Sequence, residues 1–396
     1  MSGPLRIVRL ANFVTPVSGG LRTALRHLGA GYLAAGHDPV LVVPGPGRHE
    51  EHTGQGLVIT LPGRVLPGSG GYRVLTDRKA VARVLTDLAP DRLEVSDRST
   101  LRWTGGWARR HGVRSVMVSH ESATGLLGSW GLPGPAARAV ADRLNGGTAR
   151  AYDTVLCTTD WASAEFRRVG ARNVALVPLG VDLARLTPRP AAGRRARHAG
   201  PGQVLLVLCS RLSPEKRPDR ALDALAELRR RGTDAVLAVA GAGPLRARLE
   251  TRARERGLPV HFLGHVADRS DLAALLACAD AVLAPGPVET FGLAALEALA
   301  CGTPVAVSRS SALPQLVGAA GAVAEDSGAG FADAVHELLD RPEAERRAAA
   351  RARAELYGWP AAVAGFLAAH GAAADATESA AGAVEPATAV RLRGPV

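Results

Sequence analysis

The chain has 396 residues, which is longer than a single hydrophobic core usually grows, so two domains are expected. Its formal net charge of +11 suits acidic partners such as nucleotide phosphates or an anionic lipid surface. Aromatic residues make up only 4% of the chain, too few for extended stacking on bases, which argues against nucleic acid as a partner.

The sequence predicts a cytoplasmic protein without a membrane-spanning segment. The apolar run near the N-terminus is short and broken by arginine, unlike a signal peptide, and no apolar stretch is long enough to span a bilayer. The four cysteines lie in apolar stretches without metal-type spacing. Buried thiols in a reducing compartment are therefore expected, and no metal site.

Short apolar strands alternate with helical stretches through the first half of the chain. A strand at 5–10 is followed by a loop at 15–20 and by a helix at 21–35. Further strands are expected at 40–43, 57–61, 92–95, 113–119, 154–158 and 174–178. This alternation is typical of a doubly wound parallel sheet.

A stretch rich in Pro, Arg and Gly at 187–202 interrupts the pattern and is interpreted as a linker. The alternation then restarts, with strands expected at 204–209, 236–240, 260–263, 281–284 and 304–307 and helices at 218–231, 244–256 and 272–278. We therefore expect an N-terminal domain over 1–186 and a C-terminal domain over 203–356. A helix at 357–370 is expected to cross back to the first domain, followed by a disordered tail at 371–396.

The most informative segment is 287–307, in which two carboxylates flank a short turn. Glu289 and Glu297 lie on either side of Thr290-Phe291-Gly292, which opens a helix. Eight residues are a little over two helical turns, so both carboxylates are expected near one helix face. Unpaired N–H groups at the helix start favour an anion such as a nucleotide-sugar diphosphate, whose sugar and ribose hydroxyls the carboxylates would bind. The alternative is an ordinary helix running from the surface into the core.

The loop after the strand at 204–209 carries Arg211 and Lys216. Ligands of open α/β sheets bind beyond the carboxyl ends of strands, and these two cations would hold a diphosphate there. Lys216 is one of only two lysines in the chain. The alternative is an exposed basic loop before a helix.

Two further loops of the second half face the same expected cleft. Gly241 and Gly243 superficially resemble a dinucleotide fingerprint, but Arg246 occupies the third glycine position. We therefore expect a tight turn near a nucleotide and no NAD site. Val266 follows the strand at 260–263, where backbone groups either contact the base or simply form a turn.

The first half contributes two candidates. Gly19 and Gly20 precede the first helix, where glycine lets backbone N–H groups approach a phosphate; an ordinary helix start is the alternative. His120 follows the strand at 113–119, where it would hydrogen-bond a sugar hydroxyl or assist proton transfer. The alternative is a structural histidine with satisfied hydrogen bonds.

Together these residues resemble the retaining glycosyltransferases of family four, over nearly the whole chain to about residue 370. That family has the GT-B fold, in which two Rossmann-like parallel-sheet domains face each other across a cleft. The resembling segments, in the family's order, are Gly19-Gly20, His120, Gly180-Val181-Asp182, Arg211 with Lys216, and Glu289 through Glu297.

The resemblance implies a nucleotide-diphosphate hexose as donor, retention of the anomeric configuration and no required metal or other cofactor. It implies that Glu297 holds the ribose and Glu289 the donor hexose. The implied catalytic residues are His120, Arg211, Lys216 and Glu289. The implied donor-binding residues are Gly19, Gly20, Gly243, Val266, Thr290, Phe291, Gly292, Leu293 and Glu297.

Catalysis of this kind must stabilise the negative charge that develops on the departing diphosphate. The expected positive field comes from Arg211, Lys216 and the helix N-termini. Because no carboxylate is evidently placed as a nucleophile, our hypothesis is a front-face mechanism in which the leaving phosphate takes the acceptor's proton. Ala312 and Gln315 depart from the family's pattern, so contacts from their loop are left open.

The acceptor is left open between a lipid-linked, a glycan and a small-molecule hydroxyl. Mannose is the favoured hexose, from Ser119-His-Glu-Ser122 and the GC-rich composition, with GDP-mannose as the favoured donor. The segment 98–111, with Trp103 and Trp107, either touches an anionic membrane at its cytoplasmic face or buries its tryptophans.

Three other functions stay open at this point. A sugar-nucleotide epimerase of the same fold would want carboxylates facing the hexose from both domains, and the first domain shows no such set. A nicotinamide dehydrogenase is disfavoured because the fingerprint is incomplete. A non-catalytic sugar-nucleotide-binding relative would keep the diphosphate site without turnover.

Overall fold

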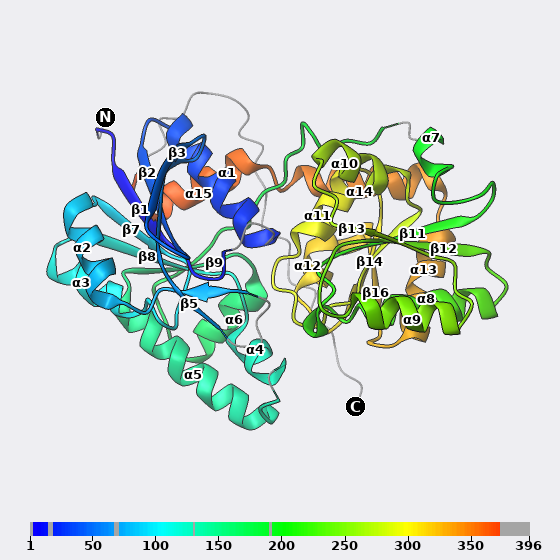
Figure 1. Cartoon of the computed structure of the whole chain (residues 1–396), viewed down its shortest axis with the longest axis horizontal. Coiled ribbons are helices and arrows are strands. Elements are labelled where there is room, and N and C mark those ends of the chain that lie inside the picture. The colour runs from blue at the N-terminus through cyan, green and yellow to red at the C-terminus, as the bar shows by residue number, and fades with distance from the viewer. Residues whose placement is uncertain (1–2, 15–18, 67–70, 130, 190–191, 373–396) are drawn as a thin grey trace, which may run out of the picture.

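The computed structural model describes residues 3–14, 19–66, 71–129, 131–189 and 192–372. These residues form two α/β domains that lie side by side (Figure 1). The expected disordered tail lies outside the described residues, except for its first two residues. Each domain is built on a largely parallel sheet, as the alternation of strands and helices predicts.

The first domain contains an eight-stranded sheet in the order β10-β9-β8-β7-β1-β2-β4-β3. Its strands are β1 (Arg6–Leu10), β2 (Asp38–Gly45), β3 (His49–Thr53), β4 (Gly56–Pro62), β7 (Arg92–Val95), β8 (Arg114–Ser119), β9 (Thr154–Cys157) and β10 (Val174–Leu176). Its helices are α1 (Gly20–Ala34), α2 (Arg78–Leu88), α3 (Trp103–Arg110), α4 (Ala123–Ser129), α5 (Gly134–Ala151) and α6 (Asp160–Arg168). All neighbouring strands are parallel except β3, which pairs antiparallel with β4 at the edge.

Successive residues of β1 enter two different cores because side chains alternate across a strand. Ile7 packs with Leu28 of α1, on the same side as the C-terminal helix. Val8 packs with Leu85 of α2 and Phe166 of α6 on the other side. A parallel sheet covered on both faces needs such apolar runs, which explains why the strands were readable from sequence.

The second domain contains a six-stranded, wholly parallel sheet in the order β13-β12-β11-β14-β15-β16. Its strands are β11 (Val204–Cys209), β12 (Ala235–Ala240), β13 (Val260–Gly264), β14 (Ala281–Ala284), β15 (Val305–Ser308) and β16 (Ala322–Ala324). Its helices are α7 (Ala192–Arg195), α8 (Pro218–Arg230), α9 (Arg246–Glu255), α10 (Arg269–Cys278), α11 (Leu293–Ala300), α12 (Leu313–Val317), α13 (Gly328–Leu339) and α14 (Glu343–Glu355), with short 3-10 turns η1 (Pro214–Lys216) and η2 (Gly318–Ala320).

The last helix, α15 (Trp359–Ala369), returns from the second domain to the first and packs on α1 (Figure 1). Glycines allow the close approach: a Cβ on Gly31 would lie 2.3 Å from a methyl of Val363. A Cβ on Gly180 would lie 2.5 Å from the backbone nitrogen of Trp359. The indole of Trp359 also stacks on His27 of α1, with 4.6 Å between ring centroids.

A buried cluster around Glu94 of the first sheet includes His370, which follows the end of this returning helix. Nε of Arg9 lies 2.9 Å from Oε1 of Glu94, and both side chains are 1% exposed. The hydroxyl of Tyr32 donates to Oε2 of Glu94 at 2.7 Å, and Nε2 of His370 lies 3.1 Å from the same oxygen. Burial alone would raise the pKa of Glu94, but Arg9, His370 and Tyr32 together lower it well below its usual range.

Several elements differ from the expectations. Strand β3 was not predicted, because its sequence His-Glu-Glu-His-Thr is polar throughout and pairs at the sheet edge through its backbone. The hairpin of β5 (Arg64–Val65) and β6 (Arg73–Val74) and the three-residue β16 were missed because such short strands carry no periodic pattern. Helix α10 begins earlier than expected, because the Asp268 side chain accepts a hydrogen bond from the backbone N–H of Asp271.

The tryptophans of the segment 98–111 favour burial over membrane contact. The helix there, α3, has eight residues, and Trp107 is 5% exposed in the core and stacked on His111. Trp103 is partly buried, with the guanidinium of Arg78 over its ring. All four cysteines are free thiols, and three of them are buried.

We predict that Glu94→Gln lowers the free energy of unfolding by roughly 3–5 kcal/mol, because Arg9 would be left buried without a counter-ion. The folded-state pKa of Glu94 is lowered, so the charged carboxylate should stabilise the fold fully at pH values above the pKa that Glu94 has in the unfolded chain. This stabilisation should be lost progressively as the pH falls from that value toward the lower folded-state pKa. Urea denaturation at neutral and acidic pH measures both effects.

Asp38→Asn is the matched control, because Asp38 also pairs with an arginine of β1. That pair, Arg6 with Asp38, is close to half exposed and should contribute only about 0–1 kcal/mol. Equal losses in the two variants would contradict the importance assigned to Glu94.

Candidate active site

The expected site residues follow the carboxyl ends of parallel strands in both domains. His120 follows β8, Arg211 follows β11, Gly243 follows β12, Val266 follows β13 and Glu289 follows β14. Gly19 and Gly20 begin α1, the helix after β1. This is the edge at which open α/β sheets bind ligands.

The starts of two helices from different domains lie close together. A Cβ on Gly20, the first residue of α1, would lie 3.7 Å from Cδ1 of Leu293, the first residue of α11. Helix starts carry unpaired N–H groups and the positive end of the helix dipole. Two such ends at one place favour an anion between the domains.

The turn before α11 depends on Gly292, which has a left-handed backbone with φ of +71°. A Cβ there would lie 2.2 Å from Cδ2 of Leu313, so both conformation and space require glycine. Thr290 and Phe291 are 4% and 6% exposed, and the Phe291 ring packs edge-on against Tyr357. Contacts of these two residues with a ligand would therefore come from the backbone.

The two carboxylates of the motif do not share a helix face, so that part of the expectation was wrong. Helix α11 begins at Leu293, after the left-handed Gly292, and Glu289 therefore lies in the preceding loop. Oε2 of Glu289 contacts Nζ of Lys216. Glu297, within the helix, accepts a hydrogen bond from Arg269 at 2.6 Å. Each carboxylate thus has its own cation.

Glu297 is 8% exposed, and burial raises its pKa although Arg269 opposes the shift. Arg269 was not among the expected site residues. It lies at the start of α10, 28 residues before Glu297, and only the packing of α10 beside α11 brings the two side chains together.

Arg211 and Lys216 lie on one loop but have different partners. Lys216 contacts Glu289, whereas the Arg211 guanidinium carbon lies 4.8 Å from the ring centroid of Tyr72 and its Nη2 lies 3.7 Å from Oε1 of Glu215. The loop after β12 packs closely on this one: a Cβ on Gly243 would lie 2.4 Å from the carbonyl oxygen of Leu212. This close approach fits the tight turn expected at Gly241–Gly243. Val266 is partly buried against the core of the second domain.

His120 is held in the neutral form. Its Nε2 lies 3.0 Å from Oγ of Ser96, and burial lowers its pKa to about 4. A neutral imidazole at pH 7 can donate one hydrogen bond and accept another. His120 therefore suits hydrogen bonding to a sugar hydroxyl better than charge stabilisation.

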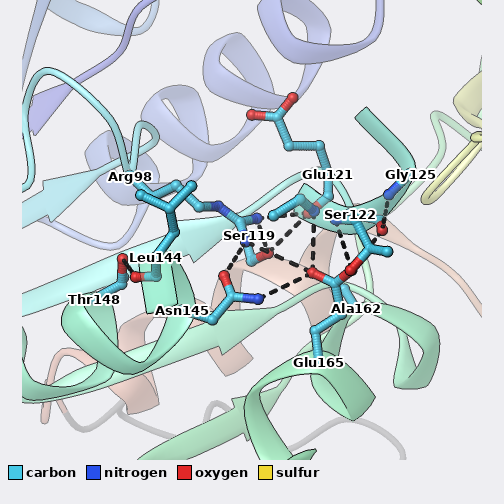
Figure 2. A network of polar contacts seen from close by, with 12 residues as sticks. Arg98, Ser119, Glu121, Ser122, Gly125, Leu144, Asn145, Thr148, Ala162 and Glu165 are labelled. Carbon is cyan, nitrogen blue, oxygen red and sulfur yellow. Dashed lines mark hydrogen bonds and ion pairs between the residues drawn. The ribbon is translucent and has the colours of Figure 1, made fainter. Parts of the chain in front are cut away.

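The turn that carries His120 is fixed by Arg98, a buried residue that sequence reasoning did not identify; Figure 2 shows its contacts with Ser119 and Glu121 on either side of His120. Its guanidinium donates to Oδ1 of Asn145 at 2.7 Å, to Oγ of Ser119 at 2.5 Å and to the carbonyl oxygen of Glu121 at 2.5 Å. These contacts hold the backbone on both sides of His120. In Figure 2 the Glu121 carboxylate points away from this network.

Glu165 of α6 fixes the next part of the same turn (Figure 2). It accepts hydrogen bonds from the Ser122 hydroxyl at 2.6 Å and from the backbone N–H groups of Ala123 and Thr124 at 3.0 Å. Burial opposes ionisation, but these bonds and one from Asn145 lower the pKa of Glu165. The charged carboxylate thereby caps the short helix α4.

Within the described ranges, no group of three or more His, Cys, Asp or Glu side chains is arranged to hold a metal ion. In the same part of the chain, no helix combines the length and the apolar character needed to cross a membrane.

Comparison with known proteins agrees with this arrangement. Residues 194–355 match the family described as glycosyl transferases group 1, and residues 19–181 match the glycosyl transferase 4-like domain. The solved structure of sucrose-phosphate synthase from Thermosynechococcus elongatus superposes with a TM-score of 0.76 at 20% identity, covering 91% of this chain and 97% of that one. The fold is therefore GT-B, as the resemblance implied.

Two curated relatives are closer in sequence. A GDP-mannose-dependent alpha-(1-6)-phosphatidylinositol dimannoside mannosyltransferase of Mycobacterium tuberculosis is 52% identical over 376 residues, 94% of this chain and 98% of the relative. A GDP-mannose-dependent alpha-(1-6)-phosphatidylinositol monomannoside mannosyltransferase of Mycolicibacterium smegmatis is 35% identical over 266 residues, 62% of this chain and 65% of the relative.

The fold and the family define a retaining glycosyltransferase that uses a nucleotide-sugar donor. The chain belongs to the group 1 glycosyl transferases. The roles of the individual site residues stay predictions.

We predict that His120→Gln lowers the transfer rate about tenfold, the order of one lost hydrogen bond to the substrate. The pH profile between 6 and 8 should keep its shape, because the pKa of His120 is about 4 and the group does not titrate in that range. Initial rates across this range test both statements. A limb near pH 6.5 that disappears in His120→Gln would contradict the neutral assignment.

Proposed function

We propose that this chain transfers a mannosyl residue from GDP-mannose to a hydroxyl of a phosphatidylinositol mannoside, with retention of configuration. The observation that carries the proposal is the 52% identity, over 94% of the chain, to the M. tuberculosis mannosyltransferase of that specificity. The excess of basic residues suits both substrates, because each carries phosphate.

In the proposed complex the donor lies between the domains. The diphosphate meets the starts of α1 and α11 together with Arg211 and Lys216, and Glu297 binds the ribose hydroxyls. Glu289 binds hydroxyls of the mannose, and its contact with Lys216 places the hexose site beside the diphosphate site. The meeting of Gly20 with Leu293 supports this placement.

The proposed reaction proceeds on one face of the sugar. The bond between the anomeric carbon and the diphosphate oxygen breaks, the acceptor oxygen bonds to the anomeric carbon, and the acceptor's proton passes to the leaving phosphate. The cations and helix starts stabilise the charge that develops on the diphosphate. No bound metal is required in this scheme, because the protein supplies the positive charge.

We predict that GDP raises the melting temperature of the protein, whereas UDP, ADP and NAD do not. At about a hundredfold its Kd, GDP should add roughly 2.7 kcal/mol of stability. Glu297→Ala should abolish the shift, and Glu255→Ala, an exposed glutamate on α9, should keep it. A shift with UDP alone would contradict the proposed donor.

The same proposal predicts transfer of labelled mannose from GDP-mannose to phosphatidylinositol mannosides in detergent, with an α-linked product. The rate should survive removal of divalent metals with EDTA. GDP release without a mannosylated lipid would contradict the acceptor, and a loss of rate that added metal restores would contradict the metal-free scheme.

We also propose that the protein acts in the cytoplasm, at the inner face of the plasma membrane, because the proposed acceptor is a lipid. Helix α5 of the first domain exposes Val140, which is 41% exposed, with the exposed Arg143 one turn further on, and it also exposes Arg138. Exposed basic groups on a helix that also exposes an apolar side chain suit an anionic bilayer surface.

We predict that the protein floats with vesicles containing phosphatidylinositol and does not float with neutral vesicles. Exchanging Arg138 and Arg143 for glutamate should weaken binding about tenfold or more, since each basic group near such a surface contributes about 1 kcal/mol. The same exchange of the exposed Arg248 and Arg254 on α9 is the charge-matched control. Equal weakening in both pairs would contradict a role for α5.

A further inference from the structure

One contact of the site crosses from the second domain to the first. Arg211 follows β11 of the second domain, and Tyr72 directly precedes β6 of the first. The guanidinium of Arg211 lies over the Tyr72 ring, with 4.8 Å between the guanidinium carbon and the ring centroid. This distance is within the range of an attractive cation–π interaction. The Arg211 side chain is 43% exposed, and its Nη2 also lies 3.7 Å from Oε1 of Glu215 on its own loop, so Tyr72 is its contact from the other domain.

Tyr72 is itself held by Phe13, a residue with an unusual backbone. The Phe13 ring packs edge-on against Tyr72, with 6.2 Å between centroids and 67° between planes. Phe13 has φ of +60°, a left-handed conformation that bulky side chains rarely adopt. Its backbone N–H donates to the carbonyl of Arg73 at 3.4 Å. Strained residues of this kind persist where the surroundings fix them, frequently at functional sites.

The hairpin of β5 and β6 is fastened on its other side as well. The Arg73 guanidinium donates to the carbonyl oxygen of Gly63 at 2.8 Å, which ties β6 to the chain that enters the hairpin. Phe13 therefore holds the Tyr72 ring directly, and Arg73 fixes the backbone next to it. A ring fixed in this way can restrict a long side chain that rests on it.

We propose that Tyr72 positions the guanidinium of Arg211 for the diphosphate of the donor, so that a side chain of the first domain completes the nucleotide-sugar site of the second. This inference rests on the proposed role of Arg211. A guanidinium held against an aromatic face keeps its in-plane N–H groups available for phosphate oxygens. Holding a flexible side chain in advance also lowers the entropy lost when the ligand binds.

The contact also makes the donor site depend on the approach of the two domains. Arg211 can rest on Tyr72 only when the loop after β11 lies beside the hairpin. Tyr72 is thus a positioning residue: it acts through Arg211 on a ligand that it does not itself bind.

The test is a double-mutant cycle on the affinity for GDP, measured by titration calorimetry, together with kcat/KM for GDP-mannose. Tyr72→Leu should weaken both about two- to fivefold, the size of an exposed cation–π contact. Tyr72→Phe keeps the aromatic face and should match the wild type. In an Arg211→Ala background, Tyr72→Leu should have no further effect, which a merely structural role of Tyr72 would not produce.

An equal loss from Tyr72→Leu in the wild-type and Arg211→Ala backgrounds would overturn the inference, as would no change or tighter GDP binding in Tyr72→Leu. The melting temperature of each unliganded variant separates loss of folding from loss of positioning. Failure of the proposed function would instead be seen in the wild type, as absent GDP binding. The double-mutant cycle would then be measured with whichever nucleoside diphosphate stabilises the wild type. If no nucleoside diphosphate stabilises the wild type, the proposed role of Arg211 is wrong, and this inference is wrong with it.

Discussion

The Glu94 carboxylate connects three parts of the molecule that no continuous stretch of chain holds together. It lies on β7 and contacts Arg9 of β1, Tyr32 of α1 and His370 at the end of α15. A buried carboxylate needs all of these partners. If one is removed, a buried charged or polar group is left unpaired, and this costs more stability than an exposed contact contributes. The end of the chain is thereby fixed to the first sheet.

This constraint has consequences for the cleft. Helix α15 is reached only after the second domain is complete, so its anchoring to the first sheet limits where the second domain lies. Trp359 packs against Gly180. The chain leaves the first domain near Gly180 and returns to it near Trp359, so the two segments that connect the domains lie together. The meeting of Gly20 with Leu293 and of Tyr72 with Arg211 depends on this relative placement.

Charge in the site is distributed in pairs. Lys216 neutralises Glu289, and Arg269 neutralises Glu297, so both carboxylates are oriented before any ligand arrives. In the proposed complex these pairs exchange part of their contacts for those of the donor. In the first domain, the Arg98 and Glu165 network also orients a site residue before any ligand arrives. It fixes the turn around His120 and leaves the His120 side chain free of that network (Figure 2).

Much of the fold was predictable from the residues. The strands expected at 92–95, 204–209 and 281–284 have those bounds. The last two are continuous apolar runs, as buried parallel strands usually are. The start of α11 was readable from Gly292, and the loops bearing Arg211 and Glu289 from their positions after strands. The prediction that Glu289 and Glu297 lie on one helix face was wrong. The spacing of two residues predicts a shared face only if both lie in the helix, and Glu289 precedes it.

The sequence by itself determined the family, the two parallel sheets and the loops that carry the site, because these follow from local periodicity and from motifs within a few residues. Only the tertiary structure decided which side chains meet: Arg269 with Glu297, Arg98 with the turn at His120, and Tyr72 with Arg211. These partners are at least 21 residues apart in the chain, and no local pattern records a contact made by packing separate elements. The packing of α15 against α1 has the same origin, since it depends on glycines whose role appears only when another backbone lies against them.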